Sequence, residues 1–136
     1  MAVNTKPIYP LTPQTLCGKT ITTANTAMDG TGTQVSVYTA GVNGARVDKL
    51  RLKALGTNIQ TVLRVFLNNG ATNETATNNS LISELTLPAT TASATDAILD
   101  RVLLLDIAIP AGYVLNCAIG TTVSAGWQVT AEGGDY

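Results

Sequence analysis

The chain has 136 residues, about the length of one domain, and it combines a 45% apolar fraction with only 12% charged residues. A chain of this length can bury enough surface to form a core of its own. The formal net charge of −1 gives no electrostatic reason to expect nucleic acid as a partner. The sequence contains no histidine, which removes the commonest general base and the commonest zinc ligand. We therefore expect a non-enzymatic protein without a cofactor or a metal.

No stretch approaches the roughly 18 consecutive apolar residues of a membrane span, so no membrane partner is expected. Residues 1–10 lack the apolar segment of a secretory signal, which predicts synthesis in the cytosol unless a signal was removed before this sequence begins. The two cysteines, Cys17 and Cys117, fit no metal-ligand spacing. Two buried, reduced thiols are the main expectation, and a disulfide between an early and a late strand is the alternative.

The N-terminus is predicted to be an extended arm over residues 1–12, followed by a single β-sandwich domain over residues 13–136. Pro7, Pro10 and Pro13 recur every third residue, which blocks a helix and favours an extended path. The arm also carries three apolar residues: Ile8, Tyr9 and Leu11. Such an arm either folds back over its own domain or lies on a neighbouring molecule.

Beyond the arm, short alternating runs are separated by turn signals such as Asn68-Asn69-Gly70 and Pro110-Ala111-Gly112. Eight strands are predicted, at residues 15–23, 34–39, 46–55, 59–67, 80–87, 101–109, 113–119 and 126–131. The one helical alternative is a short helix near residues 94–100. Eight antiparallel strands in one domain indicate a two-sheet sandwich, with a jelly roll as the leading topology.

Basic residues gather on one face of the strand predicted at residues 46–55. Leu50 and Leu52 point one way along this strand, and the side chains that point the other way are Lys49, Arg51 and Lys53. A solvated face or the protection of an edge strand is the main interpretation. An acidic protein partner is the functional alternative. Nucleic acid is disfavoured because no aromatic residues interleave the basic ones.

The strand predicted at residues 59–67 is apolar on both faces, with Val62, Arg64 and Phe66 on one of them. This pattern indicates either a strand covered on both sides or a strand with one face at a subunit contact. We expect Val62, Phe66 and part of the strand at residues 101–109 to contribute to such a contact.

The remaining polar and aromatic residues suggest no active site. Asp96, Asp100 and Asp106 are close in sequence, but solvated loop and edge charges explain them better than an acid pair held across a cleft. Trp127 shares a strand face with Val129, which places it in the core. The expected core residues are Leu50, Leu52, Leu63, Val65, Leu103, Leu105 and Trp127.

Several segments between residues 46 and 136 resemble small structural proteins of tailed bacteriophages. The segments are Leu63-Arg64-Val65-Phe66-Leu67-Asn68-Asn69-Gly70, Glu84-Leu85-Thr86-Leu87-Pro88, Leu104-Leu105-Asp106-Ile107-Ala108-Ile109-Pro110-Ala111-Gly112-Tyr113, Gly120-Thr121-Thr122-Val123-Ser124-Ala125-Gly126-Trp127 and Gly133-Gly134-Asp135-Tyr136. The resemblance implies a capsid cement or decoration protein with a jelly-roll-like sandwich, often a homotrimer. It further implies synthesis in the bacterial cytoplasm, a place on the capsid surface of the virion, and the major capsid protein as partner.

In that role the apolar residues of the arm are expected to dock on the capsid. The alternatives are a receptor- or glycan-binding module of a phage tail or fibre, and another structural protein of the phage head or neck. Jelly rolls serve more than one of these purposes, so the fold cannot decide between them.

Overall fold

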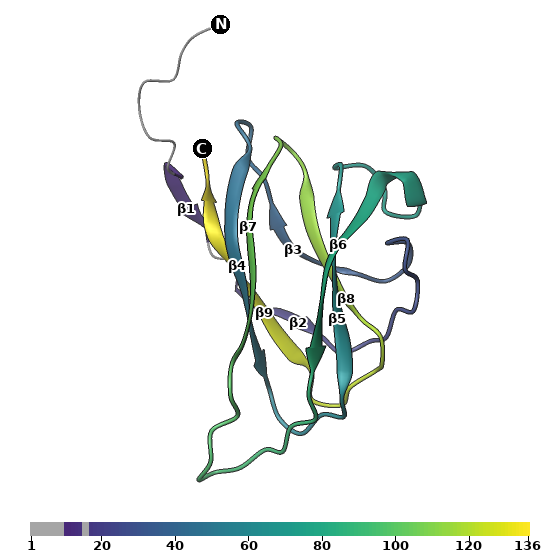
Figure 1. Cartoon of the computed structure of the whole chain (residues 1–136), viewed down its shortest axis with the longest axis vertical. Helices are drawn as coiled ribbons and strands as arrows, with labels where there is room; N and C mark the ends of the chain where they lie inside the picture. The colour runs from purple at the N-terminus through teal and green to yellow at the C-terminus, as the bar shows by residue number, and fades with distance from the viewer. Residues whose placement is uncertain (1–9, 15–16) are drawn as a thin grey trace, which may run out of the picture.

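The computed structural model describes residues 10–14 and 17–136, which fold into two antiparallel β-sheets (Figure 1). The strands of this part of the chain are β1 (Thr12–Gln14), β2 (Lys19–Ile21), β3 (Val35–Thr39), β4 (Ala45–Ala54), β5 (Thr61–Asn68), β6 (Asn79–Leu87), β7 (Arg101–Ile109), β8 (Val114–Ile119) and β9 (Trp127–Asp135). A single 3-10 turn, η1 (Ala76–Asn78), precedes β6. The predicted all-β class is confirmed.

The strand pairing is that of a jelly roll. One sheet has the order β1-β9-β4-β7, with β2 also paired to β9, and the other has the order β3-β8-β5-β6. From β2 onward the pairs are nested: β2 with β9, β3 with β8, β4 with β7, and β5 with β6. This is the pattern of one long hairpin folded over on itself to make two packed sheets.

The two sides of the sandwich differ in how well they are closed. On one side, the edge strands β2 and β3 contact each other. On the other side, no comparable contact joins the edge strands β6 and β7 in the described part of the chain, and Figure 1 shows them well separated. The inward-facing side chains there, Leu85 on β6 and Leu103, Leu105 and Ile107 on β7, are only partly buried although they pack on the core. The β6–β7 side is therefore the open side of the sandwich.

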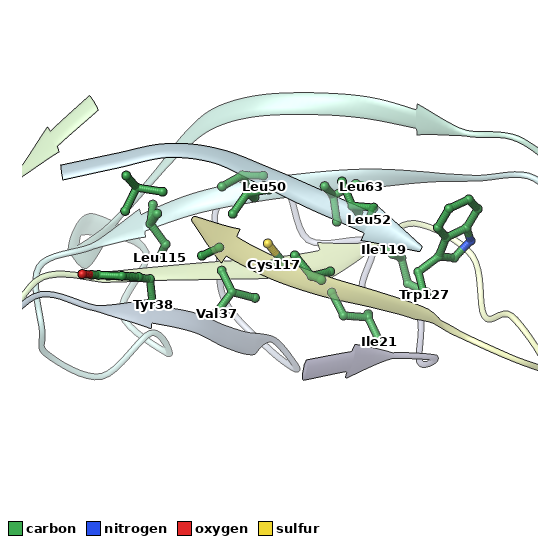
Figure 2. Close-up of a cluster of buried hydrophobic side chains, with 14 of the residues drawn as sticks. Ile21, Val37, Tyr38, Leu50, Leu52, Leu63, Leu115, Cys117, Ile119 and Trp127 are labelled. Carbon is green, nitrogen blue, oxygen red and sulfur yellow. The ribbon is translucent and has the colours of Figure 1, made fainter. Parts of the chain in front are cut away.

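The core lies between the sheets and is built from alternate residues of facing strands (Figure 2). Of the residues predicted for it, five have no exposed surface: Leu50, Leu52, Leu63, Val65 and Trp127. Leu103 and Leu105 are only partly buried, because their strand lies at the edge of its sheet, where the described residues give it one neighbouring strand.

The predicted subunit contact at Phe66 is wrong, because Phe66 is fully buried within the chain. It lies on the face of β5 opposite Leu63 and Val65, and the loop that follows β2 crosses this outer face. Asn25 fixes the loop: its backbone N–H donates to the carbonyl oxygen of Ile119 at 2.7 Å, and its own carbonyl oxygen accepts from Arg64 at 3.3 Å. The two-sided apolar pattern thus reflects a strand covered on both sides by its own chain.

Other boundaries also differ from the sequence-based expectation. Residues 94–100 form a non-helical loop, so the helical alternative is wrong. β1 was not predicted, and the last strand continues to Asp135 because β1 and β4 both pair with its end. Cys117 is a free thiol buried in the core, so the disulfide alternative is wrong. Burial raises the pKa of this thiol to about 12. Cys17 is exposed, contrary to the expectation of two buried thiols.

Replacement of Leu52 by Ala tests the assignment of the strand faces. Leu52 is fully buried in the core, so its truncation should lower the free energy of unfolding by about 2–5 kcal/mol. Val42, which is 91% exposed in the turn before β4, is the matched control, and Val42→Ala should change stability by less than about 0.5 kcal/mol. Urea denaturation measures the free energy of unfolding of both variants, and the dependence of that free energy on urea concentration should not change. Equal effects of the two substitutions would contradict the assignment.

Candidate functional site

The basic face predicted on β4 exists, but acids of the same chain occupy it. Lys49 Nζ lies 3.3 Å from Glu132 Oε2, and Arg51 Nε lies 2.9 Å from Glu132 Oε1. On the other flank, Asp100 lies 2.9 Å from Lys53 Nζ and 3.5 Å from Arg51 Nη1. The two acids and three bases form a chain of ion pairs across the outer face, which we call the charge ladder.

The strand register explains why these residues meet. Lys49 pairs directly with Glu132 of β9, while Asp100 immediately precedes β7, whose first residue pairs with Leu52 of β4. Side chains at neighbouring register positions on one sheet face approach closely enough to interact. The ladder therefore follows from β4 lying between β9 and β7.

The ladder holds both acids in their charged forms. The hydrogen bond from Arg51, aided by Lys49, lowers the pKa of Glu132. The hydrogen bond and charge of Lys53, aided by Arg51, lower the pKa of Asp100. All of these side chains are partly exposed, so each pair contributes little to stability on its own.

Two further arginines, Arg46 and Arg64, are also paired, each with an acid of a neighbouring strand. Arg46 binds Asp106 of β7 and lies 3.1 Å from Asp48, and Arg64 lies 3.0 Å from Glu84 of β6. Asp100 and Asp106 thus serve separate ion pairs and do not form an acid pair. The basic residues consequently offer an acidic partner far less free positive charge than the sequence suggested.

Beside the charge ladder, β7 exposes apolar side chains. Leu104 is 76% exposed and Val102 is 43% exposed on the outer face of this strand, and Leu99 in the preceding loop is 82% exposed. These residues adjoin the open side of the sandwich, where inward-facing side chains of β7 are only partly buried. We call β7 and its exposed side chains the β7 edge. The sequence indicated it only through its apolar run.

The described residues hold no cluster of three or more metal-ligating side chains. Two shallow hollows of about 300 and 250 Å³ flank Ile98 in the loop before β7, and both are lined mainly by small neutral and apolar residues. Within residues 10–14 and 17–136, no helix is both long and apolar enough to span a bilayer.

One carboxylate joins distant parts of the sheet. Asp135 accepts a 2.9 Å hydrogen bond from the Tyr38 hydroxyl and a 3.1 Å bond from the Gly41 backbone N–H, both at Oδ1. Its Oδ2 accepts from the Gln14 side chain. Burial, with the nearby carboxylate, raises the pKa of Tyr38 above its ordinary value. Sequence reasoning missed this cluster because no local pattern links its members.

The structure separates the residues that the sequence proposed for partner binding. Ile8 and Tyr9 lie outside the described residues. Leu11 is 82% exposed, and its backbone N–H donates to the Asp135 carbonyl at 2.8 Å, which fixes the chain beside β9. Val62 is half-buried on β5, remote in strand order from the ladder on β4.

Searches of protein-family models, curated proteins and solved structures found no match to the chain. The function must therefore be argued from the residues and the geometry.

Acid titration tests the charge ladder. The folded-state pKa of Glu132 is lowered, so its contribution to stability is present above the unfolded-state value of about 4.3 and is lost as pH falls through the lower folded-state pKa. Glu132→Gln should therefore flatten the fall of the melting temperature between about pH 5 and pH 3. Glu74, exposed in the loop before η1, supplies the control Glu74→Gln. Identical pH profiles for both variants and the wild type would refute the ladder's role.

Proposed function

We propose that the chain is a non-enzymatic structural protein of a tailed-phage virion, a capsid cement or decoration protein that binds the major capsid protein at subunit junctions. The observation that supports this proposal is that the charged and the apolar side chains of the outer surface behave differently. Charged side chains of the outer face bind one another, whereas apolar side chains of β7 stay exposed. Exposed apolar groups favour association, and mutually paired charges are poor acids and bases for catalysis near neutral pH.

The capsid part of the proposal depends on the resemblance of the segments quoted above to phage structural proteins. Those segments include most of β5 and β7, the end of β6 and the end of β9. Jelly rolls occur both in viral capsid proteins and in lectins, so the topology is compatible with the proposal without selecting it.

A cement role needs no chemistry. A protein that binds the expanded shell more tightly than its precursor stabilises the expanded state by mass action. Leu11 is the described arm residue best placed for this contact, because its side chain is 82% exposed while its backbone is held beside β9. We propose that Leu11 contacts the capsid together with Ile8 and Tyr9.

The glycan-binding alternative has less support. Sugar-binding sites commonly use an exposed aromatic platform, but Trp127, Tyr38 and Phe66 are fully buried. The other described aromatic residues, Tyr113 and Tyr136, are half-buried.

Co-sedimentation with shells of the cognate capsid protein tests the proposal. The chain should pellet with expanded shells and stay in solution with unexpanded ones, because only the expanded state offers the full junction. Leu11→Asp should abolish pelleting, whereas Val42→Asp, at a position that is 91% exposed, should leave it unchanged. A chain that pellets with neither shell, or equally with both, would overturn the cement function.

A further inference from the structure

We propose that the side chains of Gln14 and Asp135 form a clasp that holds residues 10–14, which we call the arm segment, on the edge of β9, and that this clasp opens without unfolding the sandwich. The clasp follows from the contacts of these residues, and only its use in capsid docking rests on the proposed function.

The arm segment is weakly attached apart from this contact. Its strand β1 has three residues, and the central one, Pro13, has no backbone N–H to donate. Leu11, Thr12 and Pro13 are exposed, and none of residues 10–14 belongs to the core. Figure 1 shows β1 at the margin of the molecule, beside the end of β9. A segment with so few buried contacts opens locally at low cost.

The sandwich keeps its own support for β9 when the arm segment leaves. β4 pairs with β9 from Ala45, opposite Asp135, to Ala54, opposite Trp127. β2 pairs with the other edge of β9 at residues 127–129, whereas β1 pairs at residues 133–135. Opening of the clasp therefore uncovers only a short stretch of one strand edge, and the pairs that enclose the core remain.

The Asp135 carboxylate is fixed by the sandwich on the side away from the arm segment. Its Oδ1 accepts from the hydroxyl of Tyr38, which is fully buried, and from the backbone N–H of Gly41. Its Oδ2 accepts from the side-chain amide of Gln14. A hydrogen bond to a carboxylate is roughly twice as strong as one between neutral groups. Gln14 thus meets a strong acceptor that is already held in position.

Gly134 gives the arm segment its seat beside the clasp. A Cβ at this position would lie 2.6 Å from Pro10 Cβ and 2.7 Å from the carbonyl oxygen of Thr12. The backbone N–H of Leu11 donates to the carbonyl oxygen of Asp135 at 2.8 Å. The end of β9 therefore admits the close approach of the arm segment, and the Gln14 side chain fixes it there.

A closed clasp presents Leu11 in one position. The side chain of Leu11 is 82% exposed while its backbone is bound to β9. A segment that is ordered before binding loses less conformational entropy when it meets a partner. Under the proposed function, Gln14 and Asp135 are therefore positioning residues for the capsid contact.

Amide hydrogen exchange of the full chain, followed by NMR without shells, tests the clasp. Gln14→Glu sets a second carboxylate against that of Asp135, so exchange of the Leu11 amide should accelerate at least about tenfold. Exchange of the Leu52 amide on the central strand β4 should not change, because the core stays closed. Gln60→Glu makes the same chemical change at an exposed position before β5, and it should leave both amides unchanged.

A second substitution supplies a rescue. Adding Asp135→Asn to Gln14→Glu restores one donor and one acceptor, leaves an oxygen for Tyr38, and should return slow exchange to Leu11. Gln14→Ala, which removes the donor without adding charge, should accelerate exchange at Leu11 alone. Unchanged exchange at Leu11, equal acceleration at Leu11 and Leu52, or no recovery in the double variant would overturn the proposal. A wild type that fails to pellet with shells would overturn the cement function and leave these exchange results standing.

Discussion

The position of β9 is the constraint on which the rest of the structure depends. This C-terminal strand pairs with β1 and β2 along one edge and with β4 along the other. Two glycines permit the close approach: a Cβ on Gly133 would lie 2.1 Å from the Arg46 carbonyl oxygen, and one on Gly134 would lie 2.7 Å from that of Thr12. The Asp135 carboxylate then fixes the end of the strand to Tyr38. The nested pairing is thus completed only when the last strand enters the sheet.

The surface properties follow from this closure. β4 lies between β9 and β7 in its sheet. Glu132 of β9 and Asp100 beside β7 therefore reach the basic side chains of β4 and pair with them. The outermost strand of the same sheet, β7, has no second neighbour among the described strands, and its inward apolar residues are buried only in part. The same strand order therefore gives an outer face whose charges are paired with one another and an edge strand, β7, whose apolar side chains stay exposed. The exposed apolar strand is the feature suited to association.

The alternation of apolar and polar residues along a strand correctly predicted which side chains of that strand face the core. It could not predict contacts between segments that are distant in the sequence. The period of two placed Leu50 and Leu52 in the core correctly. It could not reveal whether a loop or a second subunit covers Phe66, since both give the same apolar pattern. It also could not pair Arg51 with Glu132, 81 positions away, because that contact depends on strand order. β1 escaped detection because it has three residues, one of them proline, and its partner lies at the opposite end of the chain.

The bulge at Asp106 limits how far another strand could pair with the apolar strand β7. A left-handed conformation costs a non-glycine residue of order 1–3 kcal/mol, less for aspartate than for most, and here Arg46 holds the side chain in place. Natural sheets commonly protect edges with lysine, proline or a bulge. β7 uses only the bulge, at its sixth residue, so the flat apolar part before it stays available. An edge interrupted in this way is too short for open-ended sheet growth, although Val102 and Leu104 before the bulge stay exposed.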